Sequence, residues 1–387
     1  HDFEGYGAVS DIEKMHKYPS TDLTIISLSP KDVISESKHL KTKFLIILSG
    51  GFSPEQRKQL LKISKNKFNI IGPNSVCGVI NSENKLNTTF EREFDLKQGH
   101  ISVISQSGGV GVALLDYMIS NKVGASKFVW VGDMIDANEC DLLEYMLKDK
   151  KTKTILLYLE SIKEPRRFME IAGKSSKPII VLKSGTSEKS KERAETHTDS
   201  LSTKSEIYSA AFKQTNAIEA ESISELFNYG MLFERYKKRN VKNVAIISNT
   251  GGSSIIASDT CHKMGIKLAD LSENTKKEIE KKFPGLDAIN PLDIRADANG
   301  DRFKEMGDII VKDRNVDSIL FIMQLRSCLL EAVDIQALKR LKTGKVVIGC
   351  TPGPDDCKKI QFFLRDSVPV YNSIEDAVKV LKEVSKF

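Results

Sequence analysis

The chain has 387 residues, which is enough for two or three domains, and its 40% hydrophobic and 28% charged residues are ordinary for a globular protein. Its net charge is +6, but basic and acidic residues are interspersed, which argues against nucleic-acid binding. No apolar stretch approaches the roughly 18 residues that a membrane span needs, which excludes an integral membrane helix. The six cysteines show no CxxC or metal-ligand spacing, which predicts reduced thiols in a cytoplasmic protein and no metal site.

The first part of the chain alternates apolar strand patterns, at 22–28, 44–49 and 68–72, with helical patterns at 30–40 and 54–66. Strands that alternate with helices predict a parallel sheet with right-handed crossovers. A Rossmann-like domain would begin with a strand and a GxGxxG turn, and this sequence has none there. We therefore expect residues 1–97 to form either the C-terminal part of a Rossmann-like domain or an atypical domain of this kind.

Two short turns follow strands of this first domain. Ser49-Gly50-Gly51 and Gly72-Pro73-Asn74 could let the backbone approach a ligand closely, since glycine lacks a Cβ and tolerates positive φ. The same residues are equally typical of plain tight turns between a strand and a helix. The polar segment from 81 to 100 lacks periodicity, and we interpret it as a link to a second domain.

The second predicted domain, 98–238, opens with a strand at 101–105, the turn Ser107-Gly108-Gly109 and an apolar helix. Backbone N–H groups at such a helix N-terminus favour an anion such as phosphate. The sequence contains no GxxxxGK[ST] motif, so the turn is not a P-loop. Further strands are predicted at 128–131, 154–159 and 178–182.

Two titratable residues are predicted to lie at the carboxyl edge of this sheet. Glu160 follows the strand at 154–159 directly, and His197 ends a polar loop that leaves the strand at 178–182. The carboxyl ends of parallel strands are where open α/β sheets bind ligands. The loop is followed by a helical pattern that is predicted to place four residues on one face: Ile207, Ala210, Ala211 and Phe212.

A third predicted domain, 239–387, repeats the second. Ser105 matches Ser248, the turn Gly251-Gly252-Ser253 takes the place of the first glycine turn, and the segments 178–185 and 346–353 correspond. Gln324 replaces Glu160, and no histidine follows the last segment. Both copies therefore offer a phosphate site, but only the first offers a nucleophile.

Taken together, these segments resemble the NDP-forming acyl-CoA synthetases, and most closely the α subunit of ADP-forming acetyl-CoA synthetases. Succinyl-CoA synthetase is a more distant relative. The resemblance covers nearly the whole chain, and the segments that carry it are 49–52, 72–74, 104–109, 141–145, 157–160, 181–185, 196–198 and 290–293. It implies an α/β chain with a partial Rossmann-like CoA-binding domain followed by two flavodoxin-like (succinyl-CoA synthetase-like) parallel-sheet domains.

The resemblance also implies roles for the residues singled out above. His197 would be phosphorylated during turnover, and Glu160 would hold and polarise its imidazole. The helices that begin at the two glycine turns would grip the phosphate, and we predict that both face one phosphate ion. The residues implied in CoA binding are Ser49, Gly50, Gly51 and Asn74, and those implied in phosphate binding are Ser107, Gly108, Gly109, Gly251, Gly252 and Ser253.

The chain departs from the family at a few positions. Asp199 stands where the family has glycine, and Ser202-Thr203 replaces Ala-Gly. The glycine-rich CoA turn of the first domain is absent, as are the ATP-grasp domains. The resemblance thus implies that ATP or ADP with Mg binds an ATP-grasp subunit or domain elsewhere, within an oligomer. The organic acid is left open: acetate, 3-hydroxypropionate, 4-hydroxybutyrate, or a branched or aryl acid.

Two other functions remain open on the sequence alone. The chain could be a non-catalytic CoA-binding regulatory module, or a CoA- or nucleotide-binding scaffold that assembles a partner. The presence of both Glu160 and His197 favours an enzyme, an ADP-forming acid–CoA ligase that works through an acyl phosphate and a phosphohistidine.

Overall fold

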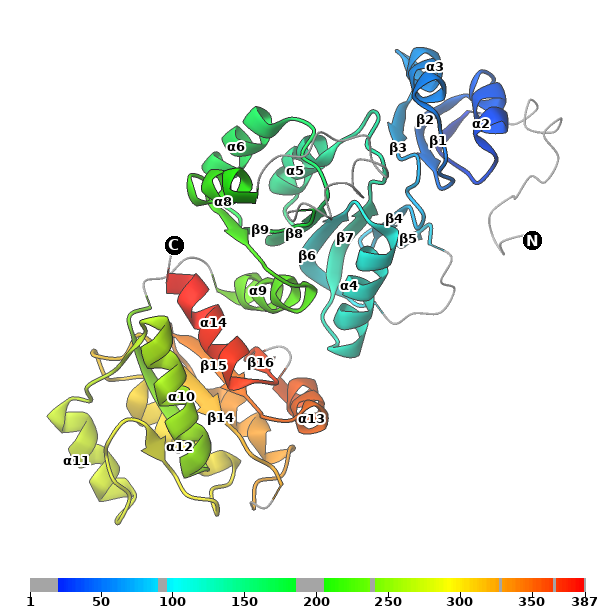
Figure 1. Ribbon diagram of the computed structural model, residues 1–387. Coiled ribbons are helices and arrows are strands. Elements are labelled where there is room, and N and C mark those ends of the chain that lie inside the picture. Colours follow the sequence, from blue (N-terminus) through cyan, green and yellow to red (C-terminus); the bar gives the residue numbers. More distant parts are fainter. Residues whose placement is uncertain are drawn as a thin grey trace. The chain divides into compact units, whose positions relative to one another are not determined.

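The structure is a computed structural model that describes residues 20–89, 96–185, 205–236, 241–326, 329–364 and 367–385. The chain divides into two compact units (Figure 1). The first runs to Asp116 and resumes from Gly124 to Ile223, and the second combines Tyr117–Val123 with Ser224–Phe387. The described residues form three sheets with helices between their strands, so the α/β prediction is confirmed.

The first unit begins with a small parallel sheet in the order β1-β2-β3. Its elements are β1 (Thr21–Ile26), α2 (Pro30–Ser37), β2 (Thr42–Ile47), α3 (Pro54–Ser64) and β3 (Asn69–Ile71). Both helices begin with proline after a serine N-cap, and Ser53 and Gln56 form a reciprocal capping box. Val33 and Leu60 bury the inner faces of the two helices against the sheet.

The segment predicted to be a link contributes two short strands, β4 (Val79–Asn81) and β5 (Leu86–Asn87). They form an antiparallel hairpin, and β4 also pairs with β7 (Ala125–Trp130) of the next sheet. Strands of three and two residues are too short to show the alternation that identifies a strand in sequence. This is why the sequence predicted no structure there.

The second sheet of this unit has seven strands in the order β10-β9-β8-β6-β7-β4-β5. Every neighbouring pair is parallel except those that involve β4. The remaining elements are β6 (Gln98–Ser105), α4 (Gly108–Ser120), α5 (Glu139–Lys148), β8 (Thr154–Leu159), α6 (Pro165–Lys174), β9 (Ile179–Lys183), α8 (Ser205–Lys213) and β10 (Ala217–Glu219).

Alternate residues of these strands face different helices. Leu157 and its same-face neighbours pack against α5, α6 and α8, which lie together in Figure 1. Phe128 and Trp130 of β7 stack at 4.0 Å between ring centroids, and Trp130 faces Gly111 of α4. The sheet is thus buried on both faces, which explains its nearly continuous apolar strands.

Helix α8 differs from the prediction in the face that it buries. Phe212 is buried with Tyr208 packed beside it, whereas Ile207 is 57% exposed. Tyr208 and Phe212 are four residues apart and therefore share one side of a helix, while Ile207 is turned away by about 100°. The predicted face, with Ile207 and Ala210, is therefore wrong for this helix.

The second unit contains a parallel sheet in the order β12-β11-β14-β15-β16, with β13 paired beside β11. Its strands are β11 (Asn243–Ser248), β12 (Lys267–Leu268), β13 (Leu292–Asp293), β14 (Ser318–Ile322), β15 (Val346–Cys350) and β16 (Val370–Tyr371). Its helices are α9 (Ile223–Arg235), α10 (Gly251–Met264), α11 (Glu273–Lys282), α12 (Gly300–Ile310), the 3-10 helix η1 (Asp334–Arg340), α13 (Pro354–Leu364) and α14 (Ile374–Ser385).

Helices cover this sheet as well. Ile247, Phe321 and Val347 belong to a core that includes residues of α11, α12 and α13. Helices α10 and α14 contact each other and lie side by side in Figure 1.

The internal repeat is visible in matching hydrogen bonds. Ser105 Oγ donates to the backbone oxygen of Ser107 at 2.7 Å, and Ser248 Oγ donates to that of Thr250 at 2.9 Å. The lysines that precede β9 and β15 also bond two backbone carbonyls each: Lys177 those of Met146 and Asp149, and Lys345 those of Asp313 and Val316. The two copies therefore share local chemistry as well as topology.

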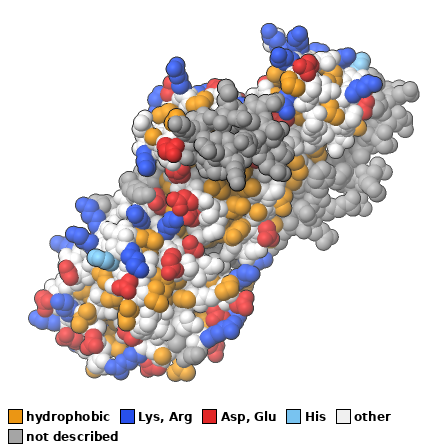
Figure 2. All heavy atoms as spheres, viewed as in Figure 1, with side chains coloured by type: hydrophobic (Ala, Val, Ile, Leu, Met, Phe, Trp, Pro, Cys, Tyr) orange, Lys and Arg blue, Asp and Glu red, His pale blue; other side chains and the backbone are white. Residues whose placement is uncertain are grey.

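The described surface carries mixed charge. On the face shown in Figure 2, Lys and Arg side chains lie interspersed with Asp and Glu. Among the described residues, no helix is both long enough and apolar enough to cross a membrane. Nor do three His, Cys, Asp or Glu side chains come together there in a way that could hold a metal ion.

Gly111 provides a test of the packing between α4 and the sheet. A Cβ added there would lie 2.1 Å from Trp130 Nε1, whereas one added at Gly173 in α6 would meet no atom within 4 Å. We expect Gly111→Ala to lower the free energy of unfolding by about 1–3 kcal/mol through overpacking. Gly173→Ala, the control, should raise it by up to about 1 kcal/mol, since alanine favours helix. Urea denaturation measures both, and equal effects would contradict this packing.

Candidate active site

The candidate site lies at the carboxyl edge of three neighbouring strands in the first unit. Strands β6, β8 and β9 are parallel, with Ser105 opposite Tyr158 and Leu159 opposite Lys183. The residues that follow these strands, Gln106, Glu160 and Ser184, therefore emerge at one edge, as the sequence predicted for Glu160. His197, the other predicted catalytic residue, lies outside the described residues.

The amide side chain of Gln106 joins β6 to the end of β8. Its Oε1 accepts the backbone N–H of Glu160 at 2.8 Å and that of Ser161 at 3.0 Å, and its Nε2 donates to Ser161 Oγ at 3.2 Å. Gln106 is 6% exposed, so loss of its amide would leave buried donors without a partner. The backbone that carries the Glu160 carboxylate is thereby held from the β6 side.

Lys183 holds the same backbone from the other side. Its Nζ donates to the backbone oxygen of Glu160 at 2.7 Å and to that of Ser184 at 2.5 Å. The side chain is 9% exposed, and its ammonium lies 4.6 Å from the centroid of the Tyr208 ring. Burial lowers the pKa of Lys183 to about 8, against the attraction of the Glu160 charge, which raises it.

A tyrosine adds a third bond at this edge. Tyr158 OH donates to Ser184 Oγ at 2.9 Å, which joins β8 again to the first residue after β9. Burial raises the pKa of Tyr158, with the charge of Glu160 acting in the same direction. The tyrosine therefore remains a neutral hydrogen-bond donor at physiological pH.

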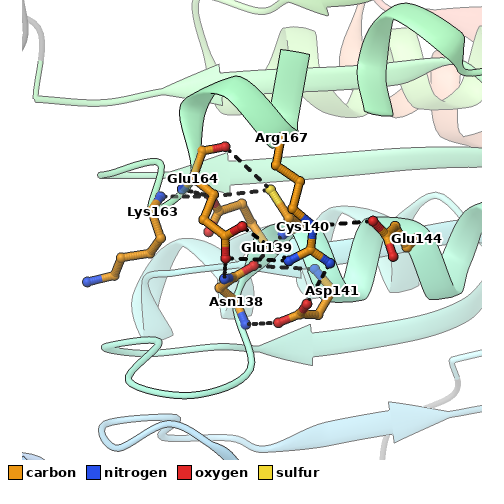
Figure 3. A network of polar contacts seen from close by, with 8 residues as sticks. All are labelled: Asn138, Glu139, Cys140, Asp141, Glu144, Lys163, Glu164 and Arg167. Atoms are coloured by element: carbon orange, nitrogen blue, oxygen red, sulfur yellow. Dashed lines mark hydrogen bonds and ion pairs between the residues drawn. The ribbon is translucent and has the colours of Figure 1, made fainter. Parts of the chain in front are cut away.

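The loop after Glu160 is fixed to the N-terminus of α5, as Figure 3 shows. Glu139 is fully buried, and its Oε1 accepts the backbone N–H of Lys163 at 2.8 Å. Asn138, the N-cap of α5, donates from Nδ2 to Glu164 Oε1 at 2.7 Å. Burial raises the pKa of Glu139, whose Oε2 has no hydrogen-bond partner among the described residues.

The turn Ser107-Gly108-Gly109 starts α4 at the same edge. Ser107 Oγ accepts the backbone N–H of Val110 at 3.4 Å, which satisfies one free N–H group of the first turn. A Cβ on Gly108 would lie 3.1 Å from Val76, but one on Gly109 would meet nothing within 4 Å. Gly109 thus offers an open approach to a helix N-terminus, which suits an anion.

The corresponding turn of the second unit differs in its electrostatics. A Cβ on Gly252 would also meet open space, but one on Gly251 would lie 3.1 Å from Asp293 Oδ2. A carboxylate beside this N-terminus opposes a bound anion. That the two helices face one phosphate stays a prediction.

The second unit also repeats the amide that bridges two neighbouring strand ends, here those of β11 and β14. Asn249 Oδ1 accepts the backbone N–H of Gln324 at 2.9 Å, and Asn249 Nδ2 donates to the backbone oxygen of Gln324 at 2.9 Å. Asn249 therefore corresponds to Gln106, and Gln324 corresponds to Glu160. The sequence alignment of Gln324 with Glu160 holds in three dimensions.

The two turns predicted to bind CoA lie side by side. The backbone N–H of Asn74 donates to the oxygen of Ser49 at 2.8 Å, and a Cβ on Gly50 would lie 3.0 Å from Asn74 Oδ1. Gly51 has a φ of +83°, which an L side chain rarely adopts. The structure thus brings Ser49, Gly50 and Asn74 together, and CoA binding there stays a prediction.

Sequence reasoning missed Lys183 and Gln106 as parts of this site. Lys183 ends an otherwise apolar strand, and a charged residue buried at a strand end is a signal that could have identified it. Gln106 gave no such signal, because its partners lie 54 and 55 residues away.

Comparisons with known proteins place this chain among CoA ligases. Residues 98–233 match the model of the succinyl-CoA ligase like flavodoxin domain. Subunit alpha of the ADP-forming acetate–CoA ligase II of Pyrococcus furiosus is 34% identical over 92% of this chain and 81% of the relative. The chain belongs to the family of ADP-forming acyl-CoA ligases. The resemblance inferred from the motifs is confirmed.

Two further comparisons agree. ADP-forming acetate–CoA ligase I of Archaeoglobus fulgidus is 32% identical over 95% of this chain, which spans 55% of that relative's length. A solved structure of dinucleotide-forming acetyl-coenzyme A synthetase 1 from Ca. Korarchaeum cryptofilum, in complex with phosphate and ADP, matches with a TM-score of 0.87 at 26% identity. That match covers 99% of this chain and 86% of the other.

The lowered pKa of Lys183 predicts a pH effect on stability. Between pH 8 and the ordinary value of 10.5, the unfolded chain binds more protons at this lysine than the folded chain does. The contribution of Lys183 to the free energy of unfolding should therefore rise with pH in that window and level off on either side. Guanidinium unfolding of the wild type and Lys183→Met from pH 7 to 11 measures it. If the free energy of unfolding changed equally with pH in both proteins, a buried ammonium at Lys183 would be contradicted.

Proposed function

We propose that this chain is the CoA-binding and phosphohistidine part of an ADP-forming acid–CoA ligase. The observation that carries the proposal is the position of Glu160. Its backbone is held by Gln106 and by Lys183 at the carboxyl edge of β8, beside the strand from which the segment to His197 departs. Membership of the ligase family supports the same conclusion.

The proposed reaction has three steps. Phosphate attacks the carbonyl carbon of the acyl-CoA thioester, the C–S bond breaks, and CoA leaves with formation of an acyl phosphate. His197 Nε2 then attacks phosphorus, the bond between phosphorus and the acyl oxygen breaks, and the organic acid leaves. The phosphoryl group passes from nitrogen to ADP, which gives ATP. Catalysis of such transfers rests on positioning and on charge stabilisation.

Glu160 has a defined task in this scheme. Its carboxylate accepts the N–H of the His197 imidazole, keeps the ring in the productive tautomer and stabilises the positive charge that develops on it. The hydrogen bonds from Gln106 and Lys183 go to the backbone of Glu160. They fix the backbone from which the carboxylate projects.

We assign phosphate to the glycine turns at the N-termini of α4 and α10. We assign most of the phosphate contacts to the turn Ser107-Gly108-Gly109. It has open space at Gly109, and it lies at the same edge of the sheet as Glu160. The turn Gly251-Gly252-Ser253 contributes less, because Asp293 opposes an anion there. Asp293→Asn should therefore strengthen any phosphate contact at the second turn.

The remaining parts of the proposal concern CoA and the partner. The turns at Ser49-Gly50-Gly51 and Asn74 would bind CoA, and an ATP-grasp subunit or domain would bind ATP or ADP with Mg in an oligomeric enzyme. The substrate is a small organic acid. A reducing compartment such as the cytoplasm fits the five described cysteines, which are all buried and form no disulfide with one another.

The first test of this function is His197→Ala. The wild-type chain should take label from 32P-acetyl phosphate in an acid-labile, alkali-stable form, and His197→Ala should take none, because it lacks the nucleophile. His262→Ala removes an exposed histidine of α10 and serves as the matched control that retains the label. Label that persists in His197→Ala would refute the phosphohistidine. A wild type that binds CoA but takes no label would favour a regulatory module.

The second test is Glu160→Gln, which places in the first copy the residue that the second copy has at this position. The fold should persist, because the bonds from Gln106 and Lys183 use the backbone. Phosphorylation by acetyl phosphate should slow by about a hundredfold or more, since a neutral amide stabilises an imidazolium poorly. Rapid-quench labelling measures the rate, and an unchanged rate would remove Glu160 from the mechanism.

A further inference from the structure

We propose that Lys183 is a positioning residue for the phosphoryl-transfer step. Its ammonium joins the backbone oxygens of Glu160 and Ser184, and so fixes the carboxylate relative to the start of the segment that leads to His197. The inference rests on the proposed function and assigns it a further residue.

The geometry of Lys183 differs from that of an ordinary surface lysine. The residue is 9% exposed, and its two acceptors are the backbone oxygens that follow two neighbouring strands. Glu160 is thereby held on both sides, since Gln106 bonds its N–H from β6. Loss of the ammonium would leave two carbonyls at this edge without their donor, and would release the Glu160 backbone on the β9 side.

The second copy of the fold shows what happens where no nucleophile is present. Thr351 stands at the position of Lys183, and its buried Oγ1 has no hydrogen-bond partner among the described residues. There, Asn249 bonds both the N–H and the oxygen of Gln324, without any charged group. The Gln324 oxygen thus receives a neutral amide donor, whereas the Glu160 oxygen receives the Lys183 ammonium. The lysine occurs in the copy that carries Glu160.

Lys177, at the other end of β9, is a lysine with a structural role. It lies just before β9, at the amino edge of the sheet, and its Nζ bonds the oxygens of Met146 at 2.9 Å and Asp149 at 2.6 Å. The second copy has a corresponding lysine, Lys345, which also bonds two backbone oxygens, those of Asp313 and Val316. A lysine present in both copies is explained by the fold alone, whereas Lys183 is present in one.

The charge of Lys183 also bears on Glu160 directly. The Glu160 charge favours the protonated form of Lys183, against the burial that lowers its pKa. The interaction between the two charges is attractive. A buried ammonium is costly to the fold, and this attraction gives a reason for its presence.

The experiment compares Lys183→Met with Lys177→Met, two variants that remove an ammonium from the two ends of β9. Labelling by 32P-acetyl phosphate should slow by about tenfold to a hundredfold in Lys183→Met, as expected for misplacement of a catalytic group, with Lys177→Met at the wild-type rate. Lys183→Thr copies the second fold repeat and replaces Lys183→Met if that variant does not fold. Equal rates in Lys183→Met and Lys177→Met would overturn the proposal.

A double-mutant cycle separates positioning from general loss of stability. If Lys183 acts through Glu160, adding Lys183→Met to Glu160→Gln should slow labelling by less than about threefold more. Fully additive effects would show that Lys183 acts independently of Glu160, and would overturn the inference. Hydrogen exchange should rise at residues 158–164 in Lys183→Met and near residue 149 in Lys177→Met.

Different results would contradict the proposed function and the role of Lys183. A wild-type chain that takes no label contradicts the proposed function, and hydrogen exchange then still decides whether Lys183 holds the Glu160 backbone. If the wild type takes label and Lys183→Met takes it at the same rate, the role of Lys183 is contradicted and the proposed function stands.

Discussion

The candidate site depends on hydrogen bonds that cross from one strand end to the next at the carboxyl edge of the sheet. Gln106 bonds the backbone N–H of Glu160, and Lys183 bonds its backbone oxygen. The ladder of the parallel sheet ends there, so side chains must replace backbone partners to keep the edge ordered. The result is a carboxylate on rigid backbone next to an open helix N-terminus, a combination suited to phosphoryl transfer.

The internal repeat separates what the fold requires from what the chemistry requires. Both copies keep a serine that bonds the backbone at the start of the glycine turn and an amide that bridges two neighbouring strand ends, β6 and β8 or β11 and β14. Both also keep a lysine at the amino edge of the sheet. The copies differ at the carboxyl edge, where Glu160 and Lys183 of the first copy correspond to Gln324 and Thr351 of the second. Asp293 beside the second glycine turn adds a further difference. Duplication has thus preserved the scaffold while the charged groups at the edge diverged.

Much of this could be predicted from sequence, because apolar strands that alternate with helices determine a parallel sheet, and the order of the strands places Glu160 at its carboxyl edge. The contacts of Gln106 and Lys183 could not, since they depend on the register between segments that are far apart in the chain. The buried face of α8 was mispredicted, because Ile207 and Tyr208 are both apolar enough to be buried and only the neighbouring sheet decides between them. The hairpin of β4 and β5 was missed because strands of two and three residues carry too little pattern.

The central claim is that acyl transfer from CoA and phosphoryl transfer to ADP are linked through this chain. The most direct measurement supplies acetyl-CoA, ADP and 32P-phosphate to the chain together with an ATP-grasp subunit of the family. The account predicts one labelled ATP for each CoA released, with acetate as the other product. Release of CoA without labelled ATP, or a reverse reaction that converts ATP to AMP and pyrophosphate, would contradict it.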